Sequence, residues 1–181
     1  MKALRQLYWH LRVMARGRRH RFDLIKALAR RPQLLFATAG YELATGLSAR
    51  VEPRLKTLAN SKVAAIVACE YCLDIGGAIA PGEGISELQL LELARYRTSE
   101  AFDDEERLVL DLAVAMTEVP VVISDDLRSR LADHFSSTQV AELTSSIAWE
   151  NHRARLNTAL DVRASGFADG MVCALPEPSR R

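Results

Sequence analysis

The chain has 181 residues, the length of one domain or of one domain with an appendage, and its 49% hydrophobic and 26% charged residues are typical of a globular protein. A formal net charge of +1 argues neither for nor against a polyanionic partner, and no apolar run approaches the roughly 20 residues of a transmembrane helix. Residues 1–16 carry charged side chains within their apolar pattern, which excludes the uncharged core of a secretory signal, so we expect a cytoplasmic protein.

Positive charge gathers at the N-terminus. Residues 1–31 hold ten Lys and Arg against one acid, Asp23, whereas the remaining residues hold fourteen basic and twenty-two acidic groups, a net of −8. Apolar residues at helical spacing predict a first helix at about 2–16, with Tyr8 and Trp9 on it. Such an arm could bind an anionic membrane surface or an acidic partner, or it could be a solvated face that pairs with the acidic remainder. No motif supports nucleic-acid binding.

The rest of the chain has the pattern of helices joined by short turns, and we predict an all-α fold. Ser or Asp followed three residues later by Glu or Gln marks two capping boxes, at 103–106 and 136–139. The only β-branched run, residues 121–123, is expected to be an extended connector. Helices are predicted at about 22–30, 33–46, 54–67, 69–80, 86–96, 103–118, 125–134 and 136–160. The expected organisation is a basic helical arm at 1–31, a helical domain at 32–162 and an irregular tail at 163–181.

Cys69 and Cys72 carry the strongest chemical signal. Three residues apart on a helix, they face the same side, one turn from each other, so their sulfurs can exchange between dithiol and disulfide. A helix that begins near Cys69 favours the thiolate, which is the reacting form. A thiolate can attack a peroxide or a disulfide, and its neighbour can resolve the product.

Two other interpretations of the cysteine pair remain open from spacing alone. The cysteines could be two small buried hydrophobic residues, because free cysteine is among the most buried residue types. A structural zinc site needs four ligands, and only Cys173 and four scattered histidines remain to complete one. We expect neither a metal nor another cofactor.

The segment 55–80 resembles the core helix pair of the carboxymuconolactone decarboxylase family, in its alkylhydroperoxidase-like branch. Both have an apolar helix followed by Cys-x-x-Cys, with an aromatic residue, here Tyr71, before the second cysteine. Further matching motifs bring the resemblance to about residues 35–162. They are Tyr96–Asp103, Glu105–Arg107, His134-Phe135, Glu142–Thr144 and Glu150–Asn157.

This resemblance implies an all-α bundle that assembles into homo-oligomers, often trimers or hexamers. Redox members of the family reduce peroxides through the cysteine pair and are reduced in turn by a thiol partner. The other members open or decarboxylate a lactone and generally lack the pair. Since both cysteines are present, the resemblance predicts an antioxidant, peroxidase-like oxidoreductase that acts on a peroxide or disulfide, with Cys69 and Cys72 as nucleophile and resolver in an undetermined order.

The chain departs from the redox members at two positions of their proton relay. Those members usually carry a histidine four residues after the second cysteine, and that position is Gly76 here. They also usually carry a glutamate twelve residues before the first cysteine, and that position is Thr57. The usual relay histidine and glutamate are therefore both missing.

Glu150 is a candidate for the missing proton transfer. It lies on one continuous stripe of the last predicted helix, with Leu143, Ile147, Ala154 and Asn157. A carboxyl group on a core-facing stripe tends to have a raised pKa, which suits proton transfer. We therefore name Glu150 as a third catalytic residue. The alternative is a structural anchor, paired to Arg153, to Arg155 or to an arginine of a neighbouring chain.

A second class of function remains open. The protein could be a non-catalytic helical oligomer that kept the fold and binds through its pocket or its basic arm. A lactone-acting decarboxylase is a more distant alternative, because no cluster of His and Arg that could hold a carboxylate substrate is apparent.

Overall fold

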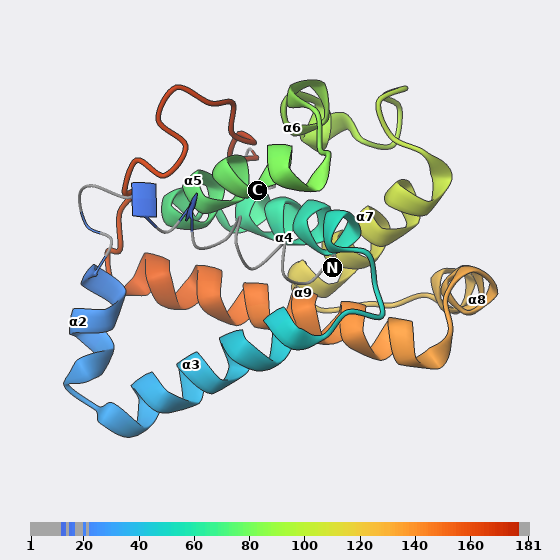
Figure 1. Ribbon diagram of the computed structural model, residues 1–181. Helices are drawn as coiled ribbons and strands as arrows, with labels where there is room; N and C mark the ends of the chain where they lie inside the picture. The colour runs from blue at the N-terminus through green and yellow to red at the C-terminus, as the bar shows by residue number, and fades with distance from the viewer. Residues whose placement is uncertain (1–11, 14, 17–19, 21, 178–181) are drawn as a thin grey trace.

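The computed structural model describes residues 12–177 apart from 14, 17–19 and 21, and every regular element in that part of the chain is a helix (Figure 1). The predicted all-α fold is confirmed. The elements are α2 (Asp23–Ala29), α3 (Pro32–Leu47), α4 (Pro53–Val67), α5 (Glu70–Ile79), η1 (Ala80–Glu83), α6 (Glu87–Glu92), η2 (Leu93–Arg95), α7 (Asp104–Thr117), α8 (Asp125–His134) and α9 (Ser137–Ala159). No helix of the described residues is long and apolar enough to cross a membrane.

Side-chain caps fix where several helices begin. Both predicted capping boxes are formed, at 103–106 for α7 and at 136–139 for α9, and a third at 86–89 opens α6. In each box the cap side chain accepts a hydrogen bond from a backbone N–H that has no partner within the helix. Ser124 caps α8 in the same way, through the N–H of Leu127. Local sequence thus determines these four helix starts.

Two predicted elements differ in detail from the structure. The segment predicted as one helix at 86–96 is the short α6 followed by the 3-10 turn η2. The predicted turn after α5 is also a 3-10 helix, η1, because Pro81 has no N–H with which to continue the α-helical pattern. Gly84 ends this turn with a φ of 79°, a left-handed conformation that glycine adopts without strain. Residues 121–123 run without helix between α7 and α8.

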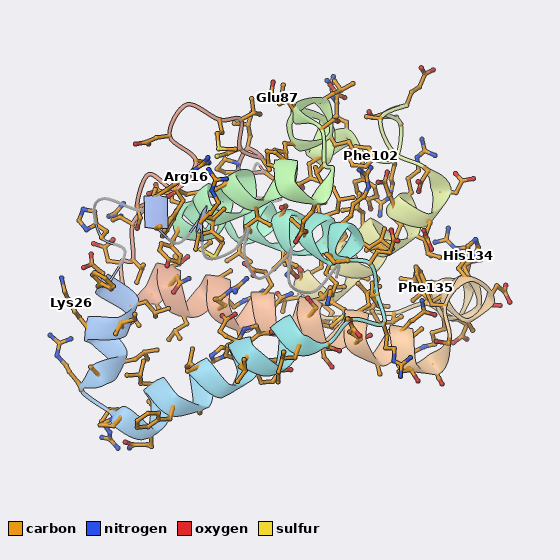
Figure 2. The ribbon with its side chains drawn as sticks, in the orientation of Figure 1. Arg16, Lys26, Glu87, Phe102, His134 and Phe135 are labelled. Carbon is orange, nitrogen blue, oxygen red and sulfur yellow. A yellow bond between two sulfur atoms is a disulfide. The ribbon has the colours of Figure 1, made fainter. Side chains whose placement is uncertain are left out.

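Helix α4 lies at the centre of the bundle and packs against α5, α7 and α9 (Figure 1). Its side chains contribute to two apolar clusters, one around the cysteine pair and one between α4, α7, α8 and α9. Phe102 is buried in the first cluster and Phe135 in the second (Figure 2). The cysteine segment is therefore part of the core rather than of a surface loop.

Helix α3 lies on the outside of the bundle alongside α9 (Figure 1), and none of its residues is buried. Tyr41 stacks on Trp149 of α9 with ring centroids 4.2 Å apart. On its other side α3 exposes large apolar side chains, with Phe36 and Leu47 each 74% exposed and Leu43 63% exposed. We call these three residues the apolar face of α3.

The segment after α9 returns to α5, although it has no regular helix. The carboxylate of Asp74 accepts backbone N–H groups from Ser165, Phe167 and Ala168 at 2.7, 3.1 and 2.8 Å. Phe167 packs in a third apolar cluster, which also contains Val13 near the start of the described chain. Residues 12, 13, 15 and 16 are helical, but most of the helix predicted at 2–16, with Tyr8 and Trp9, lies outside the described residues.

Candidate redox site

A sharp turn between α4 and α5 places Cys69. Ala68 takes a left-handed conformation with a φ of 58°, and Cys69 then occupies the N-cap of α5. The Cys69 N–H donates to the carbonyl of Ala64 at 3.0 Å. Its sulfur accepts the N–H of Cys72 at 3.2 Å, in the place where a serine or aspartate oxygen usually caps a helix. The N-terminus of α5, with its partial positive charge, therefore faces the sulfur.

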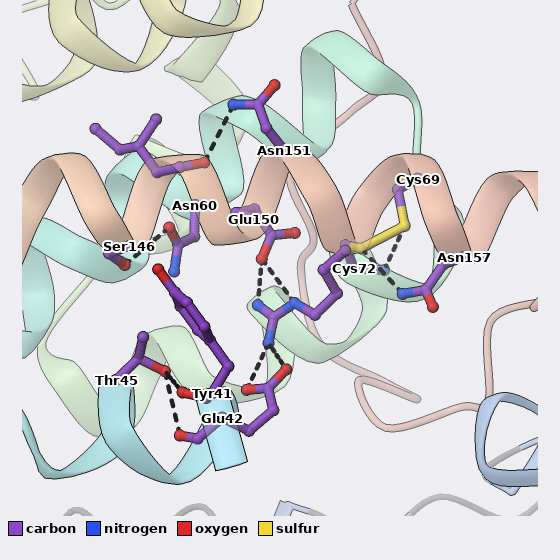
Figure 3. A network of polar contacts seen from close by, with 12 residues as sticks. Tyr41, Glu42, Thr45, Asn60, Cys69, Cys72, Ser146, Glu150, Asn151 and Asn157 are labelled. Atoms are coloured by element: carbon purple, nitrogen blue, oxygen red, sulfur yellow. Dashed lines mark hydrogen bonds and ion pairs between the residues drawn. A yellow bond between two sulfur atoms is a disulfide. The ribbon is translucent and has the colours of Figure 1, made fainter. Parts of the chain in front are cut away.

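Cys69 and Cys72 form a disulfide, with Cα atoms 5.3 Å apart (Figure 3). The structure thus brings the two cysteines together as their spacing predicted. Both are buried in the chain as it stands, since Cys69 is 2% and Cys72 is 8% exposed. Among the described residues there is no group of three or more His, Cys, Asp and Glu that could hold a metal ion.

Gly76 marks a close approach between α5 and α4. A Cβ atom added to Gly76 would lie 3.2 Å from the Oγ of Ser61 on α4, which is tight for any side chain. Ser61 is 4% exposed and its hydroxyl has no hydrogen-bond partner. The absence of a side chain at Gly76 therefore permits helix packing and leaves little room for a histidine. At the second departure from the family, Thr57 donates its hydroxyl to the carboxylate of Glu83.

Glu150 lies in a buried ion-pair network (Figure 3). The residue is 1% exposed, and its Oε2 accepts the guanidinium of Arg153, with the Nε atom at 2.9 Å. The same guanidinium donates through Nη1 to both carboxylate oxygens of Glu42 on α3, at 2.9 and 3.1 Å. The other oxygen of Glu150, Oε1, is buried without a partner. Arg153 is one of the partners predicted for Glu150 if it acts as a structural anchor.

Burial and pairing act in opposite directions on this network. Burial raises the pKa of Glu150 above its ordinary value, and the positive charge of Arg153 offsets only part of that effect. Burial also works against the charge of Arg153, but the carboxylates of Glu150 and Glu42 outweigh it and raise the pKa of Arg153. The Arg153 guanidinium thus pairs with two carboxylates at once. Its charge is shared between them, which favours protonation of the buried carboxylate, that of Glu150.

The stripe on α9 is buried as predicted, and its last member reaches the disulfide. Leu143, Ile147, Ala154 and Asn157 are each 0% exposed. The Nδ2 of Asn157 lies 3.6 Å from the sulfur of Cys72. Glu150 is seven residues earlier, about 10 Å along the helix axis. Asn157, to which sequence reasoning gave no role, therefore makes the side-chain contact between α9 and the sulfurs.

The C-terminal segment makes contacts on both sides of the cysteine pair, which sequence reasoning missed. After the pair, within α5, a Cβ atom on Gly77 would lie 2.5 Å from the sulfur of Cys173 and 3.0 Å from the carbonyl of Val172, so the segment lies directly against that helix. Before the pair, the N–H of Glu177 donates to the carbonyl of Ala65 at 2.9 Å. No local pattern marks these contacts, since they join residues far apart in the sequence.

A buried lysine holds the end of this segment. The side chain of Lys62 is 1% exposed and forms an ion pair with Glu177, whose side chain is 13% exposed. The Lys62 ammonium also donates to the carbonyl of Leu93 at 3.2 Å and lies 4.8 Å from the centre of the Tyr96 ring. Cys173 lies in the same segment, four residues before Glu177, and is a free, half-buried thiol. Burial and the nearby charge of Asp74 raise its pKa.

A second polar region lies at a cavity of about 350 Å³ between α3, α4 and α9. Lys56 and Glu142 meet there at 2.8 Å with little exposure, 11% and 6% of their side chains. Glu142 also accepts the N–H groups of Arg50 and Val51. Burial opposes its charge, but the hydrogen bonds from Lys56 and its neighbours lower the pKa of Glu142 to about 2. This ion pair fixes the beginning of α4 to α9.

The chain is similar to two proteins named as uncharacterized. It is 38% identical over 128 residues to YnjA of Escherichia coli, covering 70% of this chain and 67% of YnjA. It is 24% identical over 111 residues to YdfG of Bacillus subtilis, covering 61% of this chain and 76% of that protein. No family model matches the sequence.

Solved structures establish the fold. A protein of unknown function from Agrobacterium tumefaciens, suggested to be the antioxidant defence protein AhpD, has a TM-score of 0.72 at 22% identity, covering 76% of this chain and 94% of that one. The debrominase Bmp8 has a TM-score of 0.69 at 21% identity, covering 77% and 75%. An uncharacterized peroxidase-related protein from Silicibacter has a TM-score of 0.66 at 23% identity, covering 77% and 74%.

Proposed function

We propose, because the chain belongs to the same family as YnjA and has an AhpD-like, carboxymuconolactone decarboxylase-type fold, that it is a thiol–disulfide oxidoreductase with peroxidase-like activity. The observation that carries this proposal is the Cys69–Cys72 disulfide at the N-terminus of α5. Two of the structural neighbours are named for antioxidant defence or peroxidase relationship, which supports the same reaction class.

The proposed reaction is a two-electron reduction of a peroxide by the reduced cysteine pair. One thiolate attacks the terminal oxygen of a hydroperoxide, so that a sulfur–oxygen bond forms, the oxygen–oxygen bond breaks and an alcohol leaves after it takes up a proton. The second cysteine then attacks the sulfenic sulfur, the disulfide forms and water leaves. An external dithiol donor reduces the disulfide by thiol exchange and completes the cycle.

The helix start provides the electrostatics that this chemistry needs. A thiolate at Cys69 receives the N–H of Cys72 and the partial positive charge of the helix end. In the cytosol, which is the compartment we propose, the thiol pool keeps most cysteines reduced, so a disulfide between such a pair is a catalytic state.

Glu150 is the proposed store for the proton that the alcohol takes up. Its raised pKa, its burial and its unpartnered Oε1 support this role. The pairing with Arg153 supports the anchor interpretation equally. Replacing Glu150 by Gln and titrating the thiols of Cys69 and Cys72 separates the two, because a proton store alters the thiol pKa values and an anchor leaves them unchanged.

Substrate access requires a movement, and the C-terminal segment is the element that we propose to move. It contacts the chain at Ala65 before the pair and at Gly77 after it, and it has no regular helix of its own. Val172 and Ala174 pack in the same apolar cluster as the two cysteines. Displacement of residues 172–177 would therefore uncover that cluster while α4, α5 and α9 stay in place.

Stopped-flow oxidation tests the proposed function. The reduced wild type and the single variants Cys69→Ser and Cys72→Ser are mixed with hydrogen peroxide and with an organic hydroperoxide. We expect the wild type to lose two hydrogen atoms per chain in the 69–72 peptide by mass, and one single variant to stop at the sulfenic acid. Equal inertness of all three proteins toward both oxidants contradicts the proposal.

The burial of both sulfurs favours one alternative function, a non-catalytic helical protein in which the disulfide is structural. Thiol titration of the folded protein with and without reductant separates the two. A catalytic pair is reduced by a mild thiol and reoxidised by a mild oxidant. A structural disulfide resists reduction until the protein unfolds.

We also propose that the protein is a homo-oligomer, a trimer or hexamer by its resemblance to the family. The apolar face of α3 supports this, because Phe36, Leu43 and Leu47 form an exposed apolar surface on a helix with no buried residue. Light scattering after size-exclusion chromatography measures the mass directly. A monomer at micromolar concentration contradicts this part of the proposal.

A further inference from the structure

Asn157 brings the amide of its side chain into the core at the disulfide. The residue lies near the end of α9 and is 0% exposed, and its Nδ2 is 3.6 Å from the sulfur of Cys72 (Figure 3). Its carbonyl oxygen, Oδ1, is buried without a hydrogen-bond partner. The amide thus has one polar contact in a protein interior, and that contact is to sulfur.

A buried amide with so few hydrogen bonds is less favourable at position 157 than an apolar side chain would be. A buried acceptor without a partner destabilises the fold, and a neutral disulfide sulfur is a weak acceptor. The residues around Asn157 on the stripe, Ala154 and Ile147, are apolar, and a leucine would extend that surface at no such cost. The Nδ2 donor would bind a charged acceptor more strongly than it binds this neutral sulfur.

We infer that Asn157 is the hydrogen-bond donor that holds Cys72 as a thiolate once the disulfide is reduced. This inference rests on the proposed redox function and gives it a catalytic residue outside the cysteine segment. Reduction converts a neutral sulfur into an anion, and a hydrogen bond to an ionised acceptor is roughly twice as strong as a neutral one. The two sulfurs then have separate donors, the N–H of Cys72 for Cys69 and the amide of Asn157 for Cys72.

Among the described residues, the charged groups on the neighbouring elements have their own ion-pair or hydrogen-bond partners, and none of them is hydrogen-bonded to the Asn157 amide. On α9, Glu150 pairs with Arg153, which also binds Glu42 of α3. On α4, Lys62 pairs with Glu177 of the C-terminal segment. On α5, the carboxylate of Asp74 is held by three backbone N–H groups, as described above. Glu70 on the first turn of α5 and Arg163 after α9 lie 3.9 Å apart near the surface.

The step that Asn157 assists is the heterolytic opening of the Cys69–Cys72 disulfide. When an external thiolate attacks Cys69, a mixed disulfide forms between the two, the Cys69–Cys72 bond breaks, and its electron pair stays on Cys72 as the leaving thiolate. The Nδ2 hydrogen bond strengthens as that charge develops. When the disulfide forms again, the attacking group is the Cys72 thiolate. The same hydrogen bond keeps that thiolate deprotonated until it attacks. Asn157 therefore lowers the barrier to disulfide opening and stabilises the reduced pair in which Cys72 is a thiolate.

Two measurements on Asn157→Leu test the inference without any peroxide. In a Cys69→Ser background, the ultraviolet absorbance of the thiolate is followed against pH, and we expect the pKa of Cys72 to rise by at least about one unit, a tenfold loss of thiolate at neutral pH. In the intact pair, equilibration against dithiothreitol should favour the disulfide about tenfold more than in the wild type, which corresponds to about 30 mV.

Matched variants separate this role from a structural one. Asn151 lies on the same helix and also donates its amide, to Thr117 at 3.0 Å, so Asn151→Ala should change neither quantity. Asn157→Ser, which keeps a donor and a small volume, should lie between the wild type and Asn157→Leu and also serves if the leucine variant fails to fold. Unchanged thiolate titration in folded Asn157→Ser and Asn157→Leu overturns the inference.

The outcome is distinguishable from a failure of the proposed function. The Asn157 variants could shift the Cys72 pKa and the dithiothreitol equilibrium while the wild type reacts with neither hydroperoxide. That result would keep Asn157 as the hydrogen-bond donor to the thiolate and reject peroxide reduction. Unshifted values in a protein that reduces hydroperoxides would reject the role of Asn157 and retain the reaction.

Discussion

Lys62 and Glu177 form an ion pair across 115 positions of sequence, from the middle of α4 to the segment that follows α9. The lysine ammonium is buried, and the Glu177 carboxylate offsets part of the cost of burying its charge. Breaking a buried pair by removing one partner typically costs about 3–5 kcal/mol, since the remaining charge is left uncompensated. In the proposed opening of residues 172–177, this pair is one of the contacts that must break.

The first prediction follows from this pair. Glu177→Gln should speed the reduction of the Cys69–Cys72 disulfide by dithiothreitol about tenfold or more, because each 1.4 kcal/mol lost from the closed state raises the open population tenfold. The rate is measured by mass spectrometry after alkylation. Glu92→Gln, which removes an exposed pair with Arg95, is the control and should react like the wild type. Equal rates for all three proteins would show that access does not depend on this segment.

Gly77 provides a second route to the same movement. A methyl group there would overlap the sulfur of Cys173 and approach the carbonyl of Val172, so Gly77→Ala should displace the C-terminal segment and expose Cys173 to thiol reagents. The expected result is faster labelling of Cys173 and faster reduction of the disulfide. Gly46 lies in α3 with nothing near its Cβ position, so Gly46→Ala should leave both rates unchanged. A wild-type labelling rate in Gly77→Ala would contradict the packing described here.

The Lys56–Glu142 pair predicts part of the acid sensitivity. The pKa of Glu142 in the folded protein is lowered from 4.5 to about 2, so the pair stabilises the fold above pH 4.5, and this contribution disappears as the pH falls toward 2. A depression of that size corresponds to about 3 kcal/mol. Glu142→Gln should therefore be less stable than the wild type at neutral pH and lose less of its unfolding free energy on acidification. Urea unfolding at a series of pH values measures both. Parallel pH profiles would contradict the assignment.

The apolar face of α3 predicts the effect of surface charge on assembly. Phe36→Asp combined with Leu47→Asp places two charges on that face, and we expect the oligomer to dissociate, as measured by light scattering. Leu88 of α6 is 57% exposed and lies on another element, so Leu88→Asp should keep the mass of the wild type. Dissociation by Leu88→Asp but not by the α3 variant would move the interface to α6.

Local signals predicted helix starts well and long-range contacts poorly. Capping residues are read from four neighbouring positions, and the starts of α7, α8 and α9 follow from them. The start of α5 lacked such a signal, because its cap is the sulfur of Cys69 and the turn before it is made by Ala68 in a left-handed conformation that alanine rarely adopts. Periodicity identified the buried side of α9.

Side-chain partners depend on how helices cross, which periodicity does not contain. The pairing of Glu150 with Arg153 was one of the predicted options, since both lie on α9, whereas the second carboxylate on Arg153, from Glu42, depends on the placement of α3. The course of the last residues was predicted only as irregular. Its anchors are single backbone and ionic contacts, such as those of Asp74, and they leave no repeating pattern.

Helix α5 is a shared support, since it begins at the disulfide and its Asp74 carboxylate tethers the chain at Ser165, Phe167 and Ala168. Thermodynamic coupling between two sites is reciprocal, so if this tether disfavours opening of the disulfide, opening of the disulfide loosens the tether by the same free energy. Reduction of the disulfide would then speed hydrogen exchange at three backbone amides roughly ninety positions away along the chain.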